Sequence, residues 1–277
     1  MTRIELCGGS IHGLRWQNGD IPVLAVHGWL DNAGSFVPLG SLLSGMDVVA
    51  IDLPGHGLSA PRPDGTRYHI DDYVFDLIAI MDDLGWEQAR LLGHSLGGAV
   101  CTLTAAAAPQ RVASLALIEG LGPLTHPAQQ TAQQWRTAIE RSRPRQRRVH
   151  PTRDAAVAVR CQGRDLDEAS AKLLAERGLI REPEGWRWRH DVRLTWPSSH
   201  RYTEEQILDL LQNIEAPTVS IRANPPSGIF DATRYRKRLA ALANGQDCDG
   251  GSGGHHLHMQ HPQRIAKIIV EHFNDPA

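Results

Sequence analysis

The chain has 277 residues, of which 41% are hydrophobic and 22% charged, and its formal net charge is −2. This composition excludes a fibrous or wholly disordered protein, and the length suits one large globular domain that carries an insertion. The near-neutral charge argues against a general nucleic-acid binder, because affinity for a phosphate backbone depends on accumulated positive charge. The four cysteines are scattered along the chain, which predicts reduced thiols. Because the chain begins with polar residues and has no apolar run of ~18 residues, we expect a cytoplasmic protein without a membrane span.

Short apolar runs alternate with helical patterns along much of the chain. Such runs, bounded by turn residues, are typical of strands buried on both faces of a parallel sheet. They occupy residues 22–26, 47–51, 89–92, 115–118 and 218–221. Helical patterns cover residues 73–84 and 99–108, between the strands. Alternation of strand and helix predicts an α/β protein with a mostly parallel, doubly wound sheet.

Residues 123–214 break this alternation, and we expect them to form helices and loops. Fifteen arginines lie in this segment, so it is net positive while the rest of the chain is net negative. Amphipathic patterns predict helices near residues 132–140, 155–161, 168–177 and 204–212. An insertion of this size between core strands is most simply a helical cap over the carboxyl edge of the sheet, where α/β proteins bind ligands. The predicted core is therefore 1–122 and 215–277.

Ser95 is the strongest candidate for a nucleophile. It lies in Gly93-His94-Ser95-Leu96-Gly97, between a predicted buried strand and an alanine-rich helix. The glycines allow the close backbone approach of a strained turn, which would project the hydroxyl at the amino end of the helix. The alternative is a serine that merely caps that helix.

A serine hydroxyl needs a neighbouring base to remove its proton, and the candidate histidines cluster late in the chain. His255 ends a glycine-rich loop and is the favoured base, with His256 next; surface histidines in a loop are the alternative. His261 precedes Pro262 and is expected to enter the last helix. We expect no metal, because the histidines are too tightly spaced for a helical ligand pair and no acidic ligand is nearby. We expect no cofactor, because dinucleotide and phosphate-loop motifs are missing.

Four linked motifs resemble those of α/β-hydrolases in order and spacing, most of all the serine-hydrolase-like proteins. They are Val26-His27-Gly28-Trp29, Asp52-Leu53-Pro54-Gly55-His56-Gly57-Leu58-Ser59, Gly93-His94-Ser95-Leu96-Gly97, and Gly254-His255 ahead of His261-Pro262. The resemblance implies the α/β-hydrolase fold and an oxyanion hole formed by the backbone N–H groups of Trp29 and Leu96. It also implies a triad acid after the strand that follows the cap.

That expected position of the acid holds Pro225 and Pro226, which cannot orient an imidazole. Asp231 is the first acid beyond it and could instead cap the next helix. Glu119 ends the preceding strand, 24 positions after Ser95, a position that carries the acid in some α/β-hydrolases. We therefore favour Glu119 and keep Asp231 open, the alternative being a purely structural glutamate.

The resulting hypothesis is a serine hydrolase that cleaves a small-molecule carboxylic ester or thioester through an acyl-enzyme on Ser95. Dehalogenases and epoxide hydrolases share the fold and cap but use an aspartate nucleophile. The alternatives are a C–C bond or lactone hydrolase with the same triad, and a ligand receptor that retains the triad without catalysis.

The arginine-rich segment Arg141–Arg153 and four cap tryptophans could contribute to substrate recognition. The segment is either a solvated loop or a surface for an anionic substrate tail or an acidic carrier protein, since arginines clamp carboxylates and phosphates. A pimeloyl-carrier methyl esterase resembles this chain in its His-Gly-Trp loop and basic cap. Candidate pocket walls are Trp135, Trp186, Trp188 and Trp196.

Overall fold

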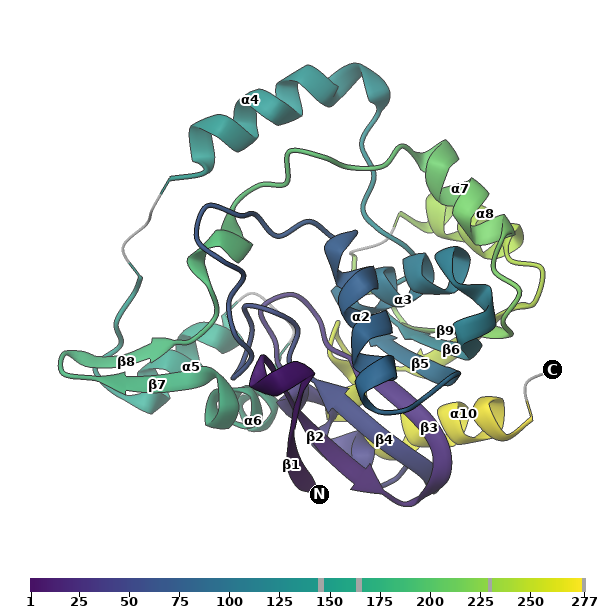
Figure 1. Cartoon of the computed structure of the whole chain (residues 1–277), viewed down its shortest axis with the longest axis horizontal. Helices are drawn as coiled ribbons and strands as arrows, with labels where there is room; N and C mark the ends of the chain where they lie inside the picture. The colour runs from purple at the N-terminus through teal and green to yellow at the C-terminus, as the bar shows by residue number, and fades with distance from the viewer. Residues whose placement is uncertain (144–146, 163–165, 229–230, 276–277) are drawn as a thin grey trace.

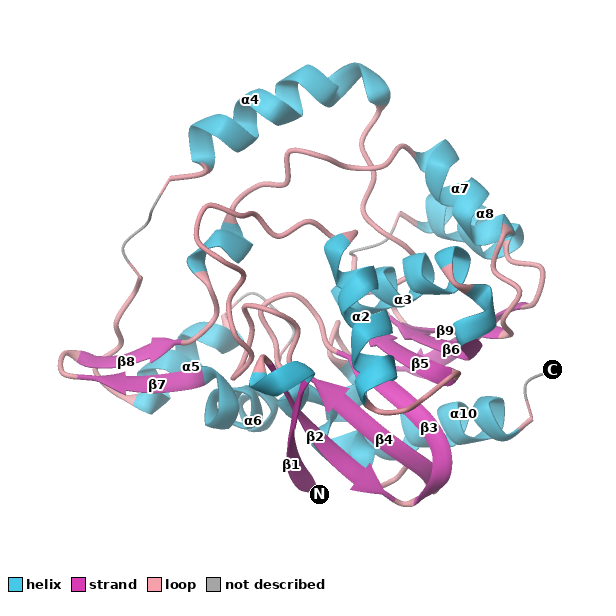
Figure 2. Ribbon diagram, viewed as in Figure 1, coloured by secondary structure: helices cyan, strands magenta, loops and turns pink. Residues whose placement is uncertain are grey.

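The computed structural model describes residues 1–143, 147–162, 166–228 and 231–275. Its main sheet has eight strands in the order β1-β2-β4-β3-β5-β6-β9-β10 (Figures 1 and 2). β2 pairs antiparallel with β1 and β4, and every other neighbouring pair is parallel. The bounds are β1 Thr2–Leu6, β2 Ile11–Gln17, β3 Gly19–Val26, β4 Gly45–Ile51, β5 Ala89–His94, β6 Val112–Ile118, β9 Thr218–Ala223 and β10 Gly245–Gly251.

The predicted fold class is confirmed, since each of the five apolar runs lies within a strand. The sequence pattern missed β1, β2 and β10 at the two ends of the sheet. β10 is Gly-Gln-Asp-Cys-Asp-Gly-Gly, a polar edge strand with a single fully buried position. Such edge strands carry little apolar signal, because only one side of their backbone is paired and their side chains meet solvent.

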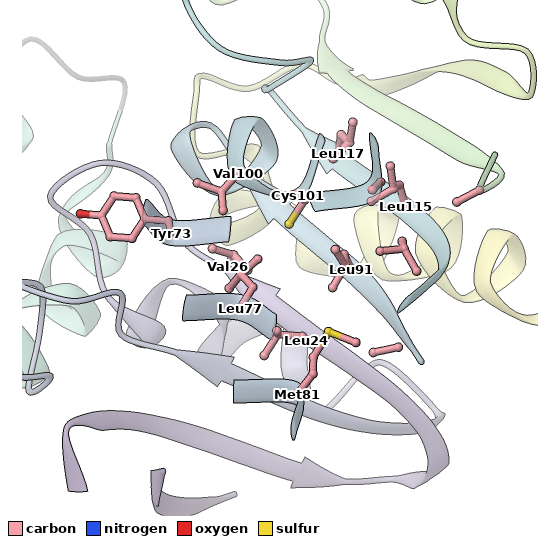
Figure 3. Packing of buried hydrophobic residues seen from close by; sticks show 14 of the residues in the cluster. Leu24, Val26, Tyr73, Leu77, Met81, Leu91, Val100, Cys101, Leu115 and Leu117 are labelled. Carbon is pink, nitrogen blue, oxygen red and sulfur yellow. The ribbon is translucent and has the colours of Figure 1, made fainter. Parts of the chain in front are cut away.

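The core lies on both faces of the sheet, as the pleat of a central strand requires. In β3, Leu24 and Val26 point to one face and join Leu77 and Val100 of the covering helices (Figure 3). Their neighbours Val23 and Ala25 point to the other face, beside the last helix. Burial on both faces explains why the parallel strands are almost continuously apolar.

Helices outside residues 123–214 cover these two faces. They are η1 Cys7–Gly9, η2 Ala33–Phe36, α1 Val37–Gly40, α2 Asp72–Asp83, α3 Leu96–Ala107, η3 Pro109–Arg111, α8 Ala232–Ala241, α9 Leu257–Gln260 and α10 Pro262–Asn274. α2 and α3 supply side chains to the cluster that contains Leu24, and α10 supplies side chains to the cluster on the opposite face. The sheet is therefore sandwiched between helices.

Residues 123–214 contain the four predicted helices and one feature that was not predicted. The elements are η4 Ala128–Gln130, α4 Thr131–Arg141, α5 Arg153–Cys161, α6 Glu168–Gly178, β7 Leu179–Glu182, β8 Gly185–Trp188, η5 Val192–Thr195 and α7 Glu204–Gln212. The expectation of helices and loops alone was wrong, because β7 and β8 form an antiparallel hairpin. The hairpin contains two tryptophans and one isoleucine, which favour strands, and a glycine with φ of 143° begins its second strand.

The helices of this segment differ in how firmly they are held. α5, α6 and the hairpin share a small apolar cluster with Met259 of α9. α4 buries only Ala138, leaves Trp135 and Ile139 exposed, and stands apart from the sheet (Figure 1).

Ion pairs with largely buried arginines join this segment to the rest of the molecule, among them Arg160 with Asp31 and the two that follow. Arg177 of α6 donates through Nε to both oxygens of Asp52, which has no exposed surface. Arg238 of α8 binds Glu204 at the start of α7 with two hydrogen bonds of 2.8 Å. Among the residues described, no helix combines the length and apolar character that a bilayer crossing requires.

Candidate active site

Ser95 sits at the sharp turn between β5 and α3 that its glycine-rich surroundings predict. Its backbone has φ of 52° and ψ of −111°, which few residues other than glycine adopt. Its N–H donates to the carbonyl of Ile118 at 2.9 Å, which ties the turn to the end of β6. Ser95 occupies the N-cap position of α3 but makes no side-chain hydrogen bond to the amides of that helix. The simple helix-cap alternative therefore receives no support.

Close backbone packing explains the glycines around Ser95. A methyl group added at Gly97 would overlap the carbonyl oxygen of Val26 at the end of β3. One added at Gly98 would lie 2.6 Å from the carbonyl oxygen of Gly120, and one at Gly120 would lie 2.6 Å from that of Ser95. The turn therefore fits only between chain segments that carry no side chain at these positions.

His255 lies beside the turn, in the loop after β10. The ring of His94, the residue before Ser95, lies with its centroid 4.8 Å from that of His255. Nε2 of His94 donates to the backbone carbonyl of His255 at 2.8 Å. The side chain of His255 is 15% exposed, so one edge of this imidazole meets solvent.

The other histidines of the cluster have different surroundings. His256 is buried, and its Nε2 lies 3.1 Å from Oδ2 of Asp31. His261 is exposed and precedes α10, as expected from the proline that follows it. The structure thus separates His255, which lies against His94 and is partly exposed, from His256, which faces the interior.

Glu119 reaches His255 from the end of β6. Its Oε2 lies 3.6 Å from Nδ1 of His255, and its side chain is 2% exposed. Oε1 accepts a 2.7 Å hydrogen bond from the N–H of Ala223, and Oε2 accepts one from the hydroxyl of Ser227. Burial alone would raise the pKa of Glu119, but its contact with the His255 imidazole and the hydrogen bonds from Ser227 and Ala223 outweigh this effect and hold the pKa below its ordinary value. The carboxylate is thus ionised and aimed at the imidazole.

Asp231, the competing candidate, lies elsewhere and serves a local purpose. It caps α8, where its carboxylate accepts hydrogen bonds from the N–H groups of Thr233 and Arg234. Those backbone hydrogen bonds lower its pKa, and its side chain is exposed. The structure brings Glu119, and not Asp231, to the imidazole of His255.

The electrostatics of His255 suit a proton acceptor. Burial lowers the pKa of this imidazole, and the neighbouring His94 lowers it further, while Glu119 opposes both effects. The ring is therefore neutral at pH 7, with a lone pair available to accept a proton.

The loop after β3 carries the predicted oxyanion donor Trp29. His27 is fully buried and braces this loop, since its Nδ1–H donates to the carbonyl of Gly28 at 2.7 Å and its Nε2 accepts from the N–H of Leu53 at 3.0 Å. The indole of Trp29 donates to the carbonyl of Leu194 in η5 at 3.0 Å. Leu96, the other predicted donor, is the first residue of α3, where amides lack an intrahelical partner.

Sequence reasoning missed two residues at the site. Ser227 donates to Glu119, and its only signal was its place after the strand that ends at Ala223. Asp31 lies four residues after His27 and is 3% exposed beside His94 and His256. The expectation that no acidic ligand lies near the histidine cluster was wrong, because the fold brings in this carboxylate from 225 positions away.

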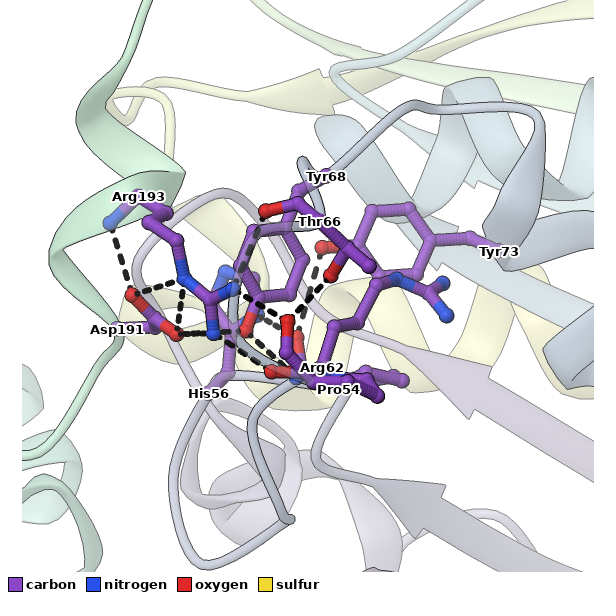
Figure 4. Close-up of polar contacts among 9 residues, drawn as sticks. Pro54, His56, Arg62, Thr66, Tyr68, Tyr73, Asp191 and Arg193 are labelled. Carbon is purple, nitrogen blue, oxygen red and sulfur yellow. Dashed lines mark hydrogen bonds and ion pairs between the residues drawn. The ribbon is translucent and has the colours of Figure 1, made fainter. Parts of the chain in front are cut away.

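A cavity of about 450 Å³ lies between the loop after β4 and the segment around η5. Tyr68 donates to Asp191 at 2.9 Å, and Arg193 binds the same carboxylate and the carbonyls of Arg62 and Thr66 (Figure 4). The cavity is lined by Gly55, Ser59, Pro61, Asp64, Arg147, Arg189, Asp191, Val192, Arg193 and Trp196. Its charge is net positive, with three arginines against two aspartates.

Among its described residues, the arginine-rich segment contributes Arg147 to this cavity. Burial lowers the pKa of Arg147, and the charge of Arg187 lowers it further, while Asp191 and Glu182 oppose both effects. Arg145 lies outside the described residues, and Arg153 stacks over Trp186 at 5.4 Å. Of the four cap tryptophans, Trp196 lines the cavity, Trp186 and Trp188 hold arginines over their rings, and Trp135 is exposed.

Comparison with known proteins agrees with this arrangement. Residues 21–262 match the model of the family described as alpha/beta hydrolase fold. A relative from Drosophila melanogaster named "Probable serine hydrolase" is 31% identical over 95% of this chain and 84% of its own length. The solved structure of the hypothetical protein PA1622 from Pseudomonas aeruginosa PAO1 shares 36% identity over 99% of both chains, with a TM-score of 0.89. The thioesterase domain from the curacin biosynthetic pathway has the same fold, with 24% identity over 97% of this chain and 98% of its own and a TM-score of 0.82.

The fold, the strained serine turn and the matched residues define the class. The chain belongs to the alpha/beta hydrolase family, in its serine-hydrolase-like branch. It is a hydrolase.

Proposed function

We propose that this hydrolase cleaves carboxylic esters or thioesters through an acyl-enzyme on Ser95. In this proposal His255 is the general base, Glu119 orients and stabilises it, and the N–H groups of Trp29 and Leu96 bind the oxyanion. The single observation that carries the proposal is the approach of Glu119 Oε2 to within 3.6 Å of His255 Nδ1, beside the strained turn at Ser95.

Each proposed role follows from the chemistry of acyl transfer. Ser95 Oγ attacks the substrate carbonyl carbon while Nε2 of His255 takes its proton, and the carbonyl oxygen becomes an anion that accepts hydrogen bonds from two N–H groups. His255 then gives its proton to the leaving alcohol or thiol as the bond to carbon breaks. A water molecule repeats the cycle on the acyl-enzyme and releases the acid. The ionised Glu119 stabilises the imidazolium in both halves.

An active-site label tests the nucleophile directly. A fluorophosphonate probe should modify the wild-type chain at Ser95 and leave Ser95→Ala unlabelled, with Ser35→Ala as the control because Ser35 is fully buried. Absence of labelling in folded wild-type protein would favour the ligand receptor. A panel of nitrophenyl esters, thioesters, lactones and diketones then separates ester and thioester hydrolysis from lactone and C–C bond cleavage.

The segment 123–214 is proposed to act as the cap that selects the substrate. α4 exposes Trp135 and Ile139, which are four residues apart on one helix face. A face of this kind gains about 25 cal/mol per Å² when it covers an apolar acyl chain. Ile139→Ser should therefore lower kcat/KM for long-chain esters and leave acetate esters unchanged. Equal losses for both would refute this role.

The cavity with three arginines supports a second element of specificity, an anionic group on the substrate or on a carrier protein. Arg147 lines the cavity, and Arg143 belongs to the same segment but is absent from the cavity wall. Arg147→Glu should raise KM for a substrate with a carboxylate or phosphate tail and leave the neutral ester unchanged. Arg143→Glu is the matched control. If Arg147→Glu leaves KM for the anionic substrate unchanged, the arginine-rich segment is a solvated loop with no part in substrate recognition.

A further inference from the structure

A second cluster of titratable side chains lies behind the nucleophile turn, on the side away from solvent. It consists of Asp31, His94 and His256, which are 3%, 0% and 4% exposed. One ligand atom from each residue lies within 4.8 Å of the other two. The proposed hydrolysis uses none of these three side chains as acid, base or nucleophile, so the cluster needs another explanation.

The protonation state of His94 leaves an electron pair pointing at the carboxylate. Its Nε2 lies 2.8 Å from the backbone carbonyl of His255, an oxygen that only accepts, so Nε2 carries the proton. Nδ1 of the neutral ring then carries a lone pair, and it lies 3.6 Å from Oδ2 of Asp31 without a hydrogen-bond partner. Two electron-rich atoms that face each other in a buried space repel unless a positive charge, either a proton on Nδ1 or a metal ion, lies between them.

Two of the three distances between the ligand atoms match those around a tetrahedral transition-metal ion, and the third is at most 4.8 Å. Zn²⁺ binds nitrogen and oxygen at about 2.0–2.2 Å in a tetrahedron, which places its ligand atoms about 3.4 Å apart. Oδ2 of Asp31 is 3.6 Å from Nδ1 of His94 and 3.1 Å from Nε2 of His256. A proton on Nε2 of His256 can move to Nδ1 of the same ring, which is buried and has no partner, so that Nε2 becomes free to bind. The bond from His94 Nε2–H to a backbone carbonyl is the outer hydrogen bond that ligating histidines typically make.

The backbone of Gly28 packs closely against these atoms. A methyl group added at Gly28 would lie 2.8 Å from Nδ1 of His94 and 3.0 Å from Oδ2 of Asp31. The glycine therefore keeps the space next to both ligand atoms free of side chain. Gly28→Ala would fill it.

One positive charge already neutralises the carboxylate. The guanidinium of Arg160 in α5 binds Oδ1 of Asp31, the oxygen that is not directed at the histidines. Its charge must oppose a divalent cation at Oδ2, so affinity depends on the balance between the two. This competition predicts that removal of the guanidinium strengthens metal binding.

We propose that Asp31, His94 and His256 form a binding site for a Zn²⁺-like transition-metal ion. Two neutral imidazoles and one carboxylate supply three ligands, and a tetrahedral ion retains one open position. The ion would couple to the hydrolytic site, because His94 holds the backbone of His255. Metal occupancy thus controls how firmly the general base is fixed.

Metal binding is measured without any assay of hydrolysis. The full chain, stripped with EDTA, is titrated with Zn²⁺ by calorimetry and with Co²⁺ while the visible ligand-field bands of tetrahedral cobalt are recorded. Asp31→Asn and His256→Gln each remove a direct ligand, so each should weaken binding by more than the ~100-fold that loss of an outer hydrogen-bond partner can cost. Arg160→Gln should tighten it by about tenfold, and Gly28→Ala should abolish it. His261→Gln, an exposed histidine of the same loop, should change nothing.

Three results would overturn the site. If the wild-type chain releases or absorbs no heat with Zn²⁺ and shows no ligand-field bands with Co²⁺, it binds no metal. Binding that survives Asp31→Asn and His256→Gln but disappears in His255→Gln belongs to the catalytic histidine instead. If Arg160→Gln leaves the metal affinity unchanged, the guanidinium does not compete with a cation at Asp31. This variant keeps the test valid if Asp31→Asn does not fold. All three outcomes leave the labelling test of Ser95 unaffected.

Discussion

Replacement of Glu119 by glutamine is the sharpest test of the proposed triad. A full charge 3.6 Å from Nδ1 of His255 interacts with an imidazolium by about 332/(20 × 3.6), or ~4.6 kcal/mol, at an effective dielectric constant of 20. At ~1.36 kcal/mol per decade this corresponds to a loss in kcat of about 10³-fold. Glutamine removes the charge and turns an amide N–H₂ toward either Ser227 or the imidazole, so orientation also deteriorates. We expect a decrease in kcat of between about 10³- and 10⁴-fold.

The matched control is Asp231→Asn, since asparagine caps a helix as well as aspartate does. It should keep kcat within about twofold of wild type and leave the melting temperature unchanged. Both variants are assayed on the best nitrophenyl ester under saturating substrate, with circular dichroism and thermal unfolding to confirm the fold. The reasoning fails if Glu119→Gln keeps more than a tenth of the activity, and it is reversed if Asp231→Asn is the variant that loses it.

Three further substitutions test the supports of the site. Ser227→Ala removes the hydroxyl that donates to the proposed triad acid and should lower kcat by about tenfold without a matching rise in KM; an effect confined to KM would contradict a positioning role. Arg177→Met leaves Asp52 buried without its cation, so we expect the free energy of unfolding to fall by about 3–5 kcal/mol in urea melts. A loss under about 1 kcal/mol would show that this ion pair contributes little to stability. Gly97→Ala places a methyl group against the carbonyl of Val26 and should lower the kcat of the folded fraction more than tenfold. An unchanged kcat would mean that the turn can relax around the methyl group.

The sequence predicted those parts of the site that short segments determine. The turn at Ser95 follows from glycines within a few residues, and the parallel strands follow from continuous apolar runs. The choice between Glu119 and Asp231 stayed open at the sequence level, because it depends on which loop folds back over the end of β6. In the structure Ala223 and Ser227 both donate to Glu119 beside His255, which supports Glu119 as the proposed acid.

Other features escaped prediction because their partners are distant in the chain. Asp31 has no local pattern that marks it, and only the fold places it against His256. The β7–β8 hairpin is short, and four-residue strands give too few alternations to separate them from loops. The cavity wall combines residues of the loop after β4 with residues from two separate parts of the segment 123–214, so its charge could not be read from any one segment.

His56 predicts how the stability of the protein depends on pH. It has no exposed surface, its Nδ1 lies 3.2 Å from the carbonyl of Pro54, and its Nε2 has no partner. Burial, with a smaller contribution from the neighbouring His27, holds the pKa of His56 well below 6.5. In the unfolded chain this ring binds a proton near pH 6.5, whereas in the folded chain it stays neutral to a lower pH. The free energy of unfolding therefore decreases as the pH falls below 6.5.

The expected slope is about 1.4 kcal/mol per pH unit for this residue. His56→Leu should reduce the slope of unfolding free energy between pH 6.5 and 5 by that amount, and the exposed His200→Gln should leave it unchanged. Parallel curves for wild type and His56→Leu would mean that the folded protein opens locally to protonate this ring. In that case the loop from Asp52 to Ser59, rather than the whole fold, sets the acid sensitivity, because that loop carries His56 and must move to hydrate it.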